Sequence, residues 1–178
     1  MIETDRLRLR EWRKADLQPF AELNACEHVC EFLPKTLNAT ESNEMAGRIA
    51  DHFVKHGFGL YAVELRAGNE FIGFTGLNTP SFEAHFMPAV EIGWRLAYSH
   101  WGRGYATEAG RAVLDHAFRT LKLSEIVSFT VPDNIRSRRV MEKIGLRHDE
   151  QGDFDHPGFP NGHRLRRHVL YRADNCRT

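Results

Sequence analysis

The fold is decided by the stretch His100-Trp101-Gly102-Arg103-Gly104-Tyr105-Ala106-Thr107-Glu108-Ala109. It connects an apolar, strand-like segment to a long amphipathic pattern of helical period through two closely spaced glycines. Glycines let backbone N–H groups turn toward a ligand because no Cβ stands in the way. The helix that follows adds unpaired N–H groups and the positive end of its dipole. The segment therefore predicts a cradle for a phosphate group.

The spacing of these glycines argues against two common nucleotide-binding loops. Gly102 and Gly104 are not followed by the third glycine of a dinucleotide fingerprint, and no Gly-Lys-Ser/Thr comes after them. NAD and ATP are therefore not expected as ligands. An ordinary strand-to-helix turn is the alternative, and the flanking sequence has to decide between the two.

A second block follows an apolar strand expected over residues 126–131. It reads Asn134-Ile135-Arg136-Ser137-Arg138-Arg139-Val140-Met141-Glu142-Lys143-Ile144-Gly145-Leu146. Asn134 is placed to cap a short helix, and Gly145 is placed to end it. A capped amphipathic helix without chemistry explains the apolar residues of this block, but it does not explain why both blocks occur in this order.

The two blocks resemble motifs of the GNAT superfamily of N-acetyltransferases. The first resembles its acyl-CoA pyrophosphate loop, Gln/Arg-x-x-Gly-x-Gly/Ala, with Gly104 and Ala106 in the last two places and Trp101 as a departure in the first. The second resembles Asn-x-x-Ser/Ala-x-x-Val/Leu-x-x-Lys-x-Gly-Phe. The opening stretch of residues 3–10, ETDRLRLR, resembles the first strand of the RimJ/RimL-like branch, the ribosomal-protein N-terminal acetyltransferase type.

This resemblance covers nearly the whole chain and implies a single GNAT domain over residues 1–178. The implied fold class is α/β (α+β), with a mixed, mostly antiparallel sheet of about six or seven strands flanked by about four helices. Periodicity predicts a first strand at Leu7 and Leu9, a helix capped by Asp16 and a longer helix over 40–56. Further strands are expected over 60–64, 71–76 and 89–96, a loop over 78–88 on the substrate side, and a final hairpin that includes 168–171.

Composition narrows the function further. The chain has 178 residues, a formal net charge of zero and 42% hydrophobic residues, which suits one domain with a sizeable core and gives nucleic-acid binding little electrostatic support. No apolar leader or membrane span is visible, so the cytoplasm is expected. Three cysteines, an odd number, favour a reducing compartment. Cys26, His28 and Cys30 lack a fourth zinc ligand, so helix packing is favoured there and no metal is expected.

The resemblance implies acetyl-CoA as the acyl-donor cosubstrate. The residues that it assigns to cofactor binding are Trp94, Leu96, Trp101, Gly102, Arg103, Gly104, Tyr105, Ala106, Asn134 and Arg139. Gly93 weakens a strand unless a ligand or another backbone approaches closely, so it either accommodates the pantetheine arm or packs beneath Trp94. The arginines at 136, 138 and 139 either bind phosphate or form a solvated helix face.

The resemblance also implies direct acetyl transfer without an acyl-enzyme. Cys26, Cys30 and Cys176 all lie outside both blocks, so no covalent nucleophile is evident. Many GNAT enzymes protonate the leaving thiolate with a tyrosine, but Met141 stands at that position. Ser137 matches the serine of the Asn-x-x-Ser form in the RimL-like branch, to which the resemblance assigns this role, so it is our first choice for stabilising the thiolate. The alternative is a local hydrogen bond at the helix start.

A general base has several candidates. The resemblance implies either Glu91, where several GNAT enzymes have a water-activating glutamate, or the group Asp153, Asp155 and His156, where RimL-like enzymes carry another carboxylate. Glu91 is slightly favoured, and a surface charge on the strand is its alternative. A carboxylate with an ordinary pKa is a weak base toward an ammonium group, so a raised pKa or a water relay is required.

These features predict an acetyl-CoA-dependent N-acetyltransferase. Its acceptor would be a primary amine, either a protein N-terminal α-amine or a small amine. The alternative is an acyl-CoA-binding sensor with little or no turnover. No nucleic-acid or membrane partner is expected, and homodimers are frequent in the superfamily that the chain resembles.

Overall fold

The fold is built on one mixed β-sheet in a computed structural model that describes residues 1–175. The strand order is β1-β2-β3-β4-β5-β6-β9-β7, with β8 paired to β9. All neighbouring strands are antiparallel except β5 and β6, which run parallel. The strands are β1 (Ile2–Glu3), β2 (Leu7–Arg10), β3 (Leu60–Leu65), β4 (Phe71–Asn78), β5 (Glu91–Leu96), β6 (Glu125–Thr130), β7 (Arg147–His148), β8 (Phe154–Asp155) and β9 (Arg167–Asp174).

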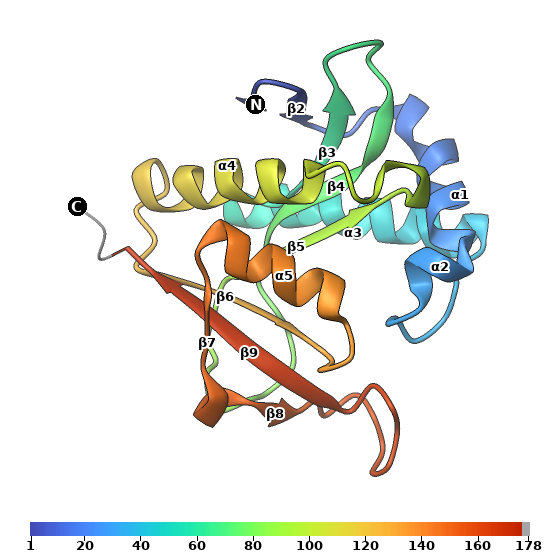
Figure 1. The fold of residues 1–178 in the computed structure, drawn as a ribbon. Helices are drawn as coiled ribbons and strands as arrows, with labels where there is room; N and C mark the ends of the chain where they lie inside the picture. Colours follow the sequence, from blue (N-terminus) through green and yellow to red (C-terminus); the bar gives the residue numbers. More distant parts are fainter. Residues whose placement is uncertain (176–178) are drawn as a thin grey trace.

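Helices cover both faces of this sheet (Figure 1). They are α1 (Leu17–Ala25), α2 (Glu27–Cys30), α3 (Ala39–His56), α4 (Tyr105–Arg119) and α5 (Ile135–Ile144). Helices α4 and α5 pack on one face through a core that includes Val113 and Met141, whereas α1 and α3 pack on the other through Phe20 and Ile49. The predicted mixed, mostly antiparallel α/β fold is therefore confirmed.

The structure contains more elements than the sequence indicated. Strands β1, β7 and β8 have two residues each, which is too short to show an alternating pattern. Helix α2 has four residues and lies in the stretch of Cys26, His28 and Cys30, for which helix packing was favoured. Within residues 1–175 the sheet therefore has nine strands and the chain has five α-helices, against the six or seven strands and four helices expected.

The role predicted for Asp16 is wrong. Its side chain does not cap α1 but lies buried, where it accepts two hydrogen bonds from Arg10, at 2.7 and 2.8 Å. Arg10 also binds the fully buried Glu64 at 2.7 Å. The first strand predicted at Leu7 and Leu9 is present as β2, and both leucines are completely buried. A buried ion-pair network therefore fastens β2 to β3 and to the start of α1.

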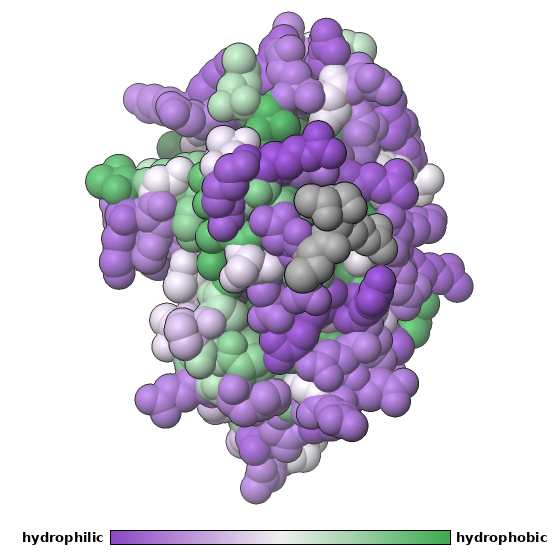
Figure 2. All heavy atoms as spheres, turned by 90° about the vertical axis from the view of Figure 1, so that its left-hand side faces the viewer, coloured by the Kyte–Doolittle hydropathy of each residue, from purple (hydrophilic) through white to green (hydrophobic). Residues whose placement is uncertain are grey.

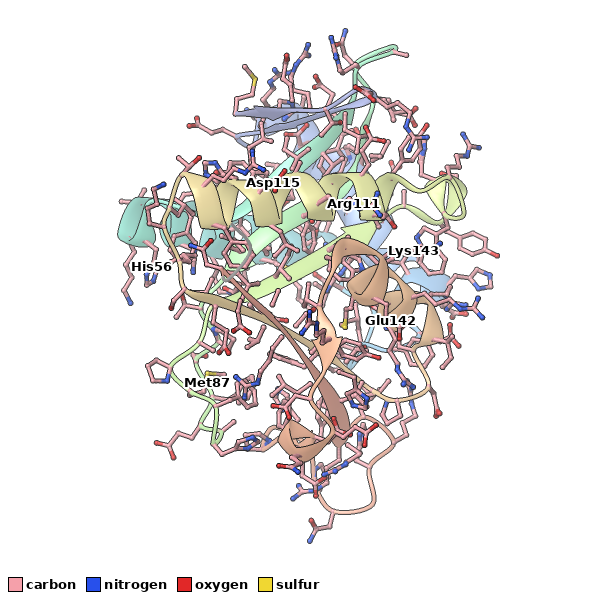
Figure 3. All side chains as sticks on the ribbon, turned by 60° about the vertical axis from the view of Figure 1, so that its left-hand side comes forward. His56, Met87, Arg111, Asp115, Glu142 and Lys143 are labelled. Atoms are coloured by element: carbon pink, nitrogen blue, oxygen red, sulfur yellow. The ribbon has the colours of Figure 1, made fainter. Side chains whose placement is uncertain are left out.

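The second block forms the helix predicted for it. Asn134 accepts a hydrogen bond from the Ser137 N–H at 3.3 Å, and Gly145 ends α5 with a φ of 102°, in the left-handed region that favours glycine. The α4–α5 contact is reinforced by Arg111, which donates to the Lys143 carbonyl at 2.8 Å (Figure 3). Both expected ends of this helix are confirmed.

The segment between β4 and β5 belongs to a third, smaller hydrophobic cluster. Phe86 is buried there against Phe154 and Leu170, so much of the expected loop packs on the β8–β9 hairpin. The surface is mostly hydrophilic on the face shown in Figure 2, where hydrophobic side chains form narrow strips. Among residues 1–175, no helix combines the length and the apolar character that crossing a membrane requires.

Candidate functional site

The site lies where the two parallel strands of the sheet separate. Within residues 1–175, Glu91 and Val127 form the single register pair between β5 and β6, and the strands part beyond it. The Ser128 hydroxyl donates to the Ile92 carbonyl at 2.9 Å near the point of separation. A cavity of about 760 Å³ extends from this opening to the start of α4 and to the loop after α2.

The glycine cradle forms one end of the cavity. Gly102 and Gly104 have φ values of 75° and 80°, which a side chain would strain, and a Cβ at Gly102 would meet no atom within 4 Å. Gly104 directly precedes the first turn of α4, whose N–H groups are the donors that a phosphate needs. The residues present therefore fit the phosphate groups of a CoA thioester.

Two hydrogen bonds hold the cradle in place. The Trp101 indole N–H donates to the Leu96 carbonyl at 2.8 Å, and Arg6 donates to the Arg103 carbonyl at 3.0 Å. Arg6 also pairs with Glu108 in α4 at 2.6 Å. The cradle is thereby tied both to the end of β5 and to the N-terminal segment.

Most of the residues predicted for cofactor binding line this one cavity. They are Trp94, Leu96, Trp101, Gly102, Gly104, Tyr105, Ala106, Asn134 and Arg139. Arg103 is not among the lining residues, and its side chain is exposed. Gly93 also lines the cavity, and a Cβ there would meet no atom within 4 Å. Apart from its two chain neighbours, no residue therefore fills the space where a side chain at Gly93 would stand.

The three arginines of α5 have separate environments. Arg136 pairs with Glu31 and lies 4.8 Å from the ring of Trp101. Arg138 donates to the Pro132 carbonyl and to the Tyr171 hydroxyl, so it is committed to the fold. Arg139 and Arg136 line the cavity, whereas Arg138 does not. The position of Arg139 suits a contact with phosphate.

Glu91 has an unusual environment for a carboxylate. It lies at the start of β5 and lines the cavity. Burial disfavours its charged form and raises its pKa from 4.5 to about 7, an effect that the neighbouring Asn78 side chain partly offsets. A carboxyl group with this pKa is a competent general base near neutral pH. Glu91 is thus a half-buried carboxyl group in the cavity wall, and its role as the base stays a prediction.

The other predicted bases differ in their availability. Asp153 accepts hydrogen bonds from His148 Nε2 at 2.9 Å and from the Leu170 N–H at 3.0 Å. Asp155 pairs with Arg166 at 3.2 Å, and neither aspartate lines the cavity. His156 does line it, and burial lowers its pKa. Glu91 and His156 are therefore the two candidate bases that reach the cavity.

Ser137 and Met141 lie on the cavity side of α5. Ser137 lines the cavity, and the hydrogen bond at the helix start is made by the Asn134 side chain to the Ser137 backbone N–H. The Ser137 hydroxyl is thus not required for capping. Met141 is buried in the core and has no proton to donate.

Sequence reasoning missed the half of the cavity that lies beyond β5. Its walls come from the α2 region, α3 and β4, through Val29, Phe32, Leu33, Pro34, Met45, Leu60 and Phe74. Arg95, on β5, also lines it. No local pattern marks these residues, because they come from segments far apart in the chain.

Comparisons with known proteins agree with this geometry. The family model for the acetyltransferase (GNAT) domain matches residues 6–147. The uncharacterized N-acetyltransferase YnaD of Bacillus subtilis is 31% identical over 153 residues, covering 83% of each chain. A crystal structure of a GNAT-family acetyltransferase from Bacillus anthracis has a TM-score of 0.81 at 26% identity, covering 98% of each chain. Mycobacterium smegmatis RimJ, solved with CoA-disulfide, has a TM-score of 0.75 at 24% identity, covering 94% of this chain and 81% of RimJ.

The fold, with its separated central strands and its glycine cradle, is that of an acyltransferase. The chain belongs to the GNAT acetyltransferase family and is an N-acetyltransferase. Enzymes of this family use acetyl-CoA. The superfamily resemblance read from the two sequence blocks is thereby confirmed.

Proposed function

We propose that this chain, as a single domain, binds acetyl-CoA across the opening between β5 and β6 and transfers the acetyl group directly to a primary amine. The observation that carries the proposal is the continuity of one cavity from the cradle at Gly104 to Glu91 and Ser137. Phosphates at the cradle would direct the pantetheine arm along the separated strands. The thioester would then lie near Gly93, where no side chain fills the space.

Each side chain has a chemical task in this proposal. Glu91 takes a proton from the acceptor ammonium, directly or through a water, so that the free amine attacks the thioester carbonyl. A backbone N–H of β5 polarises that carbonyl, and the Ser137 hydroxyl donates a hydrogen bond to the departing thiolate. The acetyl C–S bond breaks as the amide C–N bond forms, and the second proton that the nitrogen loses passes to the sulfur, so that CoA leaves as the thiol.

The acceptor is a protein N-terminal α-amine or a small amine. The structural likeness to RimJ and to a ribosomal-protein-S5-alanine acetyltransferase from Vibrio fischeri is a likeness of fold, and a Vibrio cholerae spermidine N-acetyltransferase shares it too. The acceptor must therefore be argued from the cavity itself. A cytoplasmic location and a homodimer stay predictions from the sequence and the family.

Calorimetry with acetyl-CoA tests the cofactor half of the proposal. Gly104→Glu adds a negative charge where phosphate would lie, so we expect binding to weaken at least about a hundredfold. Gly57→Glu is the matched control, because Gly57 has a similar φ of 74° at an exposed helix end outside the cavity. Pantetheine without the phosphates should bind poorly to the wild type. An equal loss of acetyl-CoA affinity in both variants, or no loss in either variant, would contradict the assignment of the cradle.

A further inference from the structure

Three residues of β5 share one face of the strand inside the cavity. Glu91, Gly93 and Arg95 alternate along β5, so they lie on the same side of the sheet, and all three line the cavity. Strand geometry separates the Cα atoms of Glu91 and Arg95 by about 13 Å. Between them Gly93 contributes no side chain, and a Cβ there would meet nothing within 4 Å. A carboxyl group and a guanidinium thus flank an open stretch of strand.

The guanidinium of Arg95 has no carboxylate partner among residues 1–175. Its Nη1 donates to the Asn24 Oδ1 at 2.6 Å and lies 3.9 Å from the Met45 sulfur, and its Cζ lies 5.4 Å from the centre of the Phe74 ring. The nearby Cys30 supplies no negative charge, because burial raises the pKa of its thiol. None of the ion pairs within 4.0 Å among the described residues includes Arg95.

This positive charge is held at a cost. Burial lowers the pKa of Arg95, but a guanidinium remains protonated at any physiological pH. A partly desolvated charge without a counterion is unfavourable, and an incoming anion would form charge-assisted hydrogen bonds with it. The arrangement is therefore suited to a ligand that brings a carboxylate.

The phosphates of acetyl-CoA are unsuited to this role. Arg95 packs with Asn24 of α1 and Met45 of α3, which cover one face of the sheet. The cradle at Gly104 starts α4, which covers the opposite face (Figure 1). The anion that meets Arg95 must therefore arrive on the acceptor side.

The rest of this half of the cavity describes the acceptor further. Its walls are apolar, through residues such as Val29, Phe32 and Leu60. Glu91 is the one carboxylate that lines the cavity within residues 1–175. A polyamine or an aminoglycoside presents several ammonium groups and would leave all but one without a partner. An acceptor with a single amine and an apolar body is matched to these walls.

We propose that the acceptor is a free amino acid with an apolar side chain, bound as a zwitterion over Gly93 with its amine toward Glu91 and its carboxylate against Arg95. This inference rests on the proposed function and specifies its substrate class. Arg95 is then a specificity-determining residue. A peptide N-terminus, whose first carboxyl group is an amide, lacks the anion that Arg95 requires.

A matched set of acceptors tests the inference. Acetyl transfer is measured for phenylalanine, leucine and methionine, for the amide of each, for dipeptides that begin with each, and for spermidine. We expect kcat/KM for the free acids to exceed that for the amides at least about tenfold. Arg95→Met should remove this preference, because the rate with the acids should fall at least about tenfold further than the rate with the amides. Arg95→Gln, which keeps a polar group for Asn24, should do the same.

Controls separate the two proposals. Arg119→Met removes an exposed arginine of α4 and should keep the preference for acids. Circular dichroism and acetyl-CoA calorimetry verify that the Arg95 variants are folded and bind the cofactor. Transfer to amides, dipeptides or spermidine as fast as to free acids would overturn the inference while leaving N-acetyl transfer intact. Failure of the wild type to bind acetyl-CoA would instead refute the proposed function.

Discussion

Replacing Glu91 by glutamine tests the proposed chemistry most directly. The variant keeps the size and the hydrogen-bonding capacity of the side chain but has no ionisable group. If Glu91 is the general base, its loss should lower kcat/KM at pH 8 by about 10²- to 10⁴-fold. Glu44→Gln, on the exposed side of α3, is the control and should behave as the wild type.

The pH dependence follows from the pKa of Glu91. A base must be deprotonated to act, and burial raises this pKa from 4.5 to about 7, so activity should increase with pH through neutrality. Between pH 8 and pH 5.5 the deprotonated fraction falls roughly 30-fold for a pKa near 7. For an unshifted carboxyl group it would fall only about 1.1-fold over the same range. The size of this fall in activity therefore depends on the burial of Glu91.

The assay is the ratio of wild-type to Glu91→Gln activity at each pH. The acceptor amine also titrates, but its contribution is common to both proteins and cancels in the ratio. We expect the ratio to fall about 30-fold from pH 8 to pH 5.5, with a midpoint near 7. A ratio that stays constant over this range, or a variant as active as the wild type, would refute the assignment of Glu91 as the base.

Three further predictions concern catalysis and stability. Ser137→Ala should lower kcat about tenfold with unchanged acetyl-CoA affinity; a loss of stability without loss of kcat would indicate a structural role. Glu91→Gln should raise the free energy of unfolding at pH 8 by about 3 kcal/mol, because ionising the buried carboxyl is unfavourable, and the gain should fade as pH falls from 7 to 4.5. Thermal melts across that range measure it, and a pH-independent gain would contradict the raised pKa. Arg10→Met should destabilise the fold by about 3–5 kcal/mol in urea, because Asp16 and Glu64 lose their buried partner; a loss below about 1 kcal/mol would show that the network is dispensable.

Local sequence was sufficient for the elements whose signals are local. Helix α5 begins at the cap that Asn134 provides and ends at Gly145, and both positions can be predicted without knowing what packs around them. The cradle could be predicted in the same way, since its glycines and the helix after them are contiguous in the chain. The cofactor-binding residues named from the two blocks accordingly lie along one cavity, apart from Arg103.

Elements that depend on residues far away in the chain could not be predicted from the sequence. Asp16 had the sequence position of a helix cap, yet its carboxylate is bound by Arg10, which is buried against Glu64 from β3. The two-residue strand β7 exists because its neighbour β9 pairs with it, and no periodicity can be seen in two residues. Their formation depends on pairing energy from segments far along the chain.

The amino-acid sequence by itself determined the family, the cradle and the helix ends, because each rests on residues that are neighbours in the chain. Only the tertiary structure decided the chemistry beyond the cradle. The pKa of Glu91 is set by burial, and Arg95 faces the cavity with Asn24, 71 residues away, as its hydrogen-bond partner. The burial of a side chain and the pairing of its charge depend on all the groups that surround it, and these groups come together only when the chain folds.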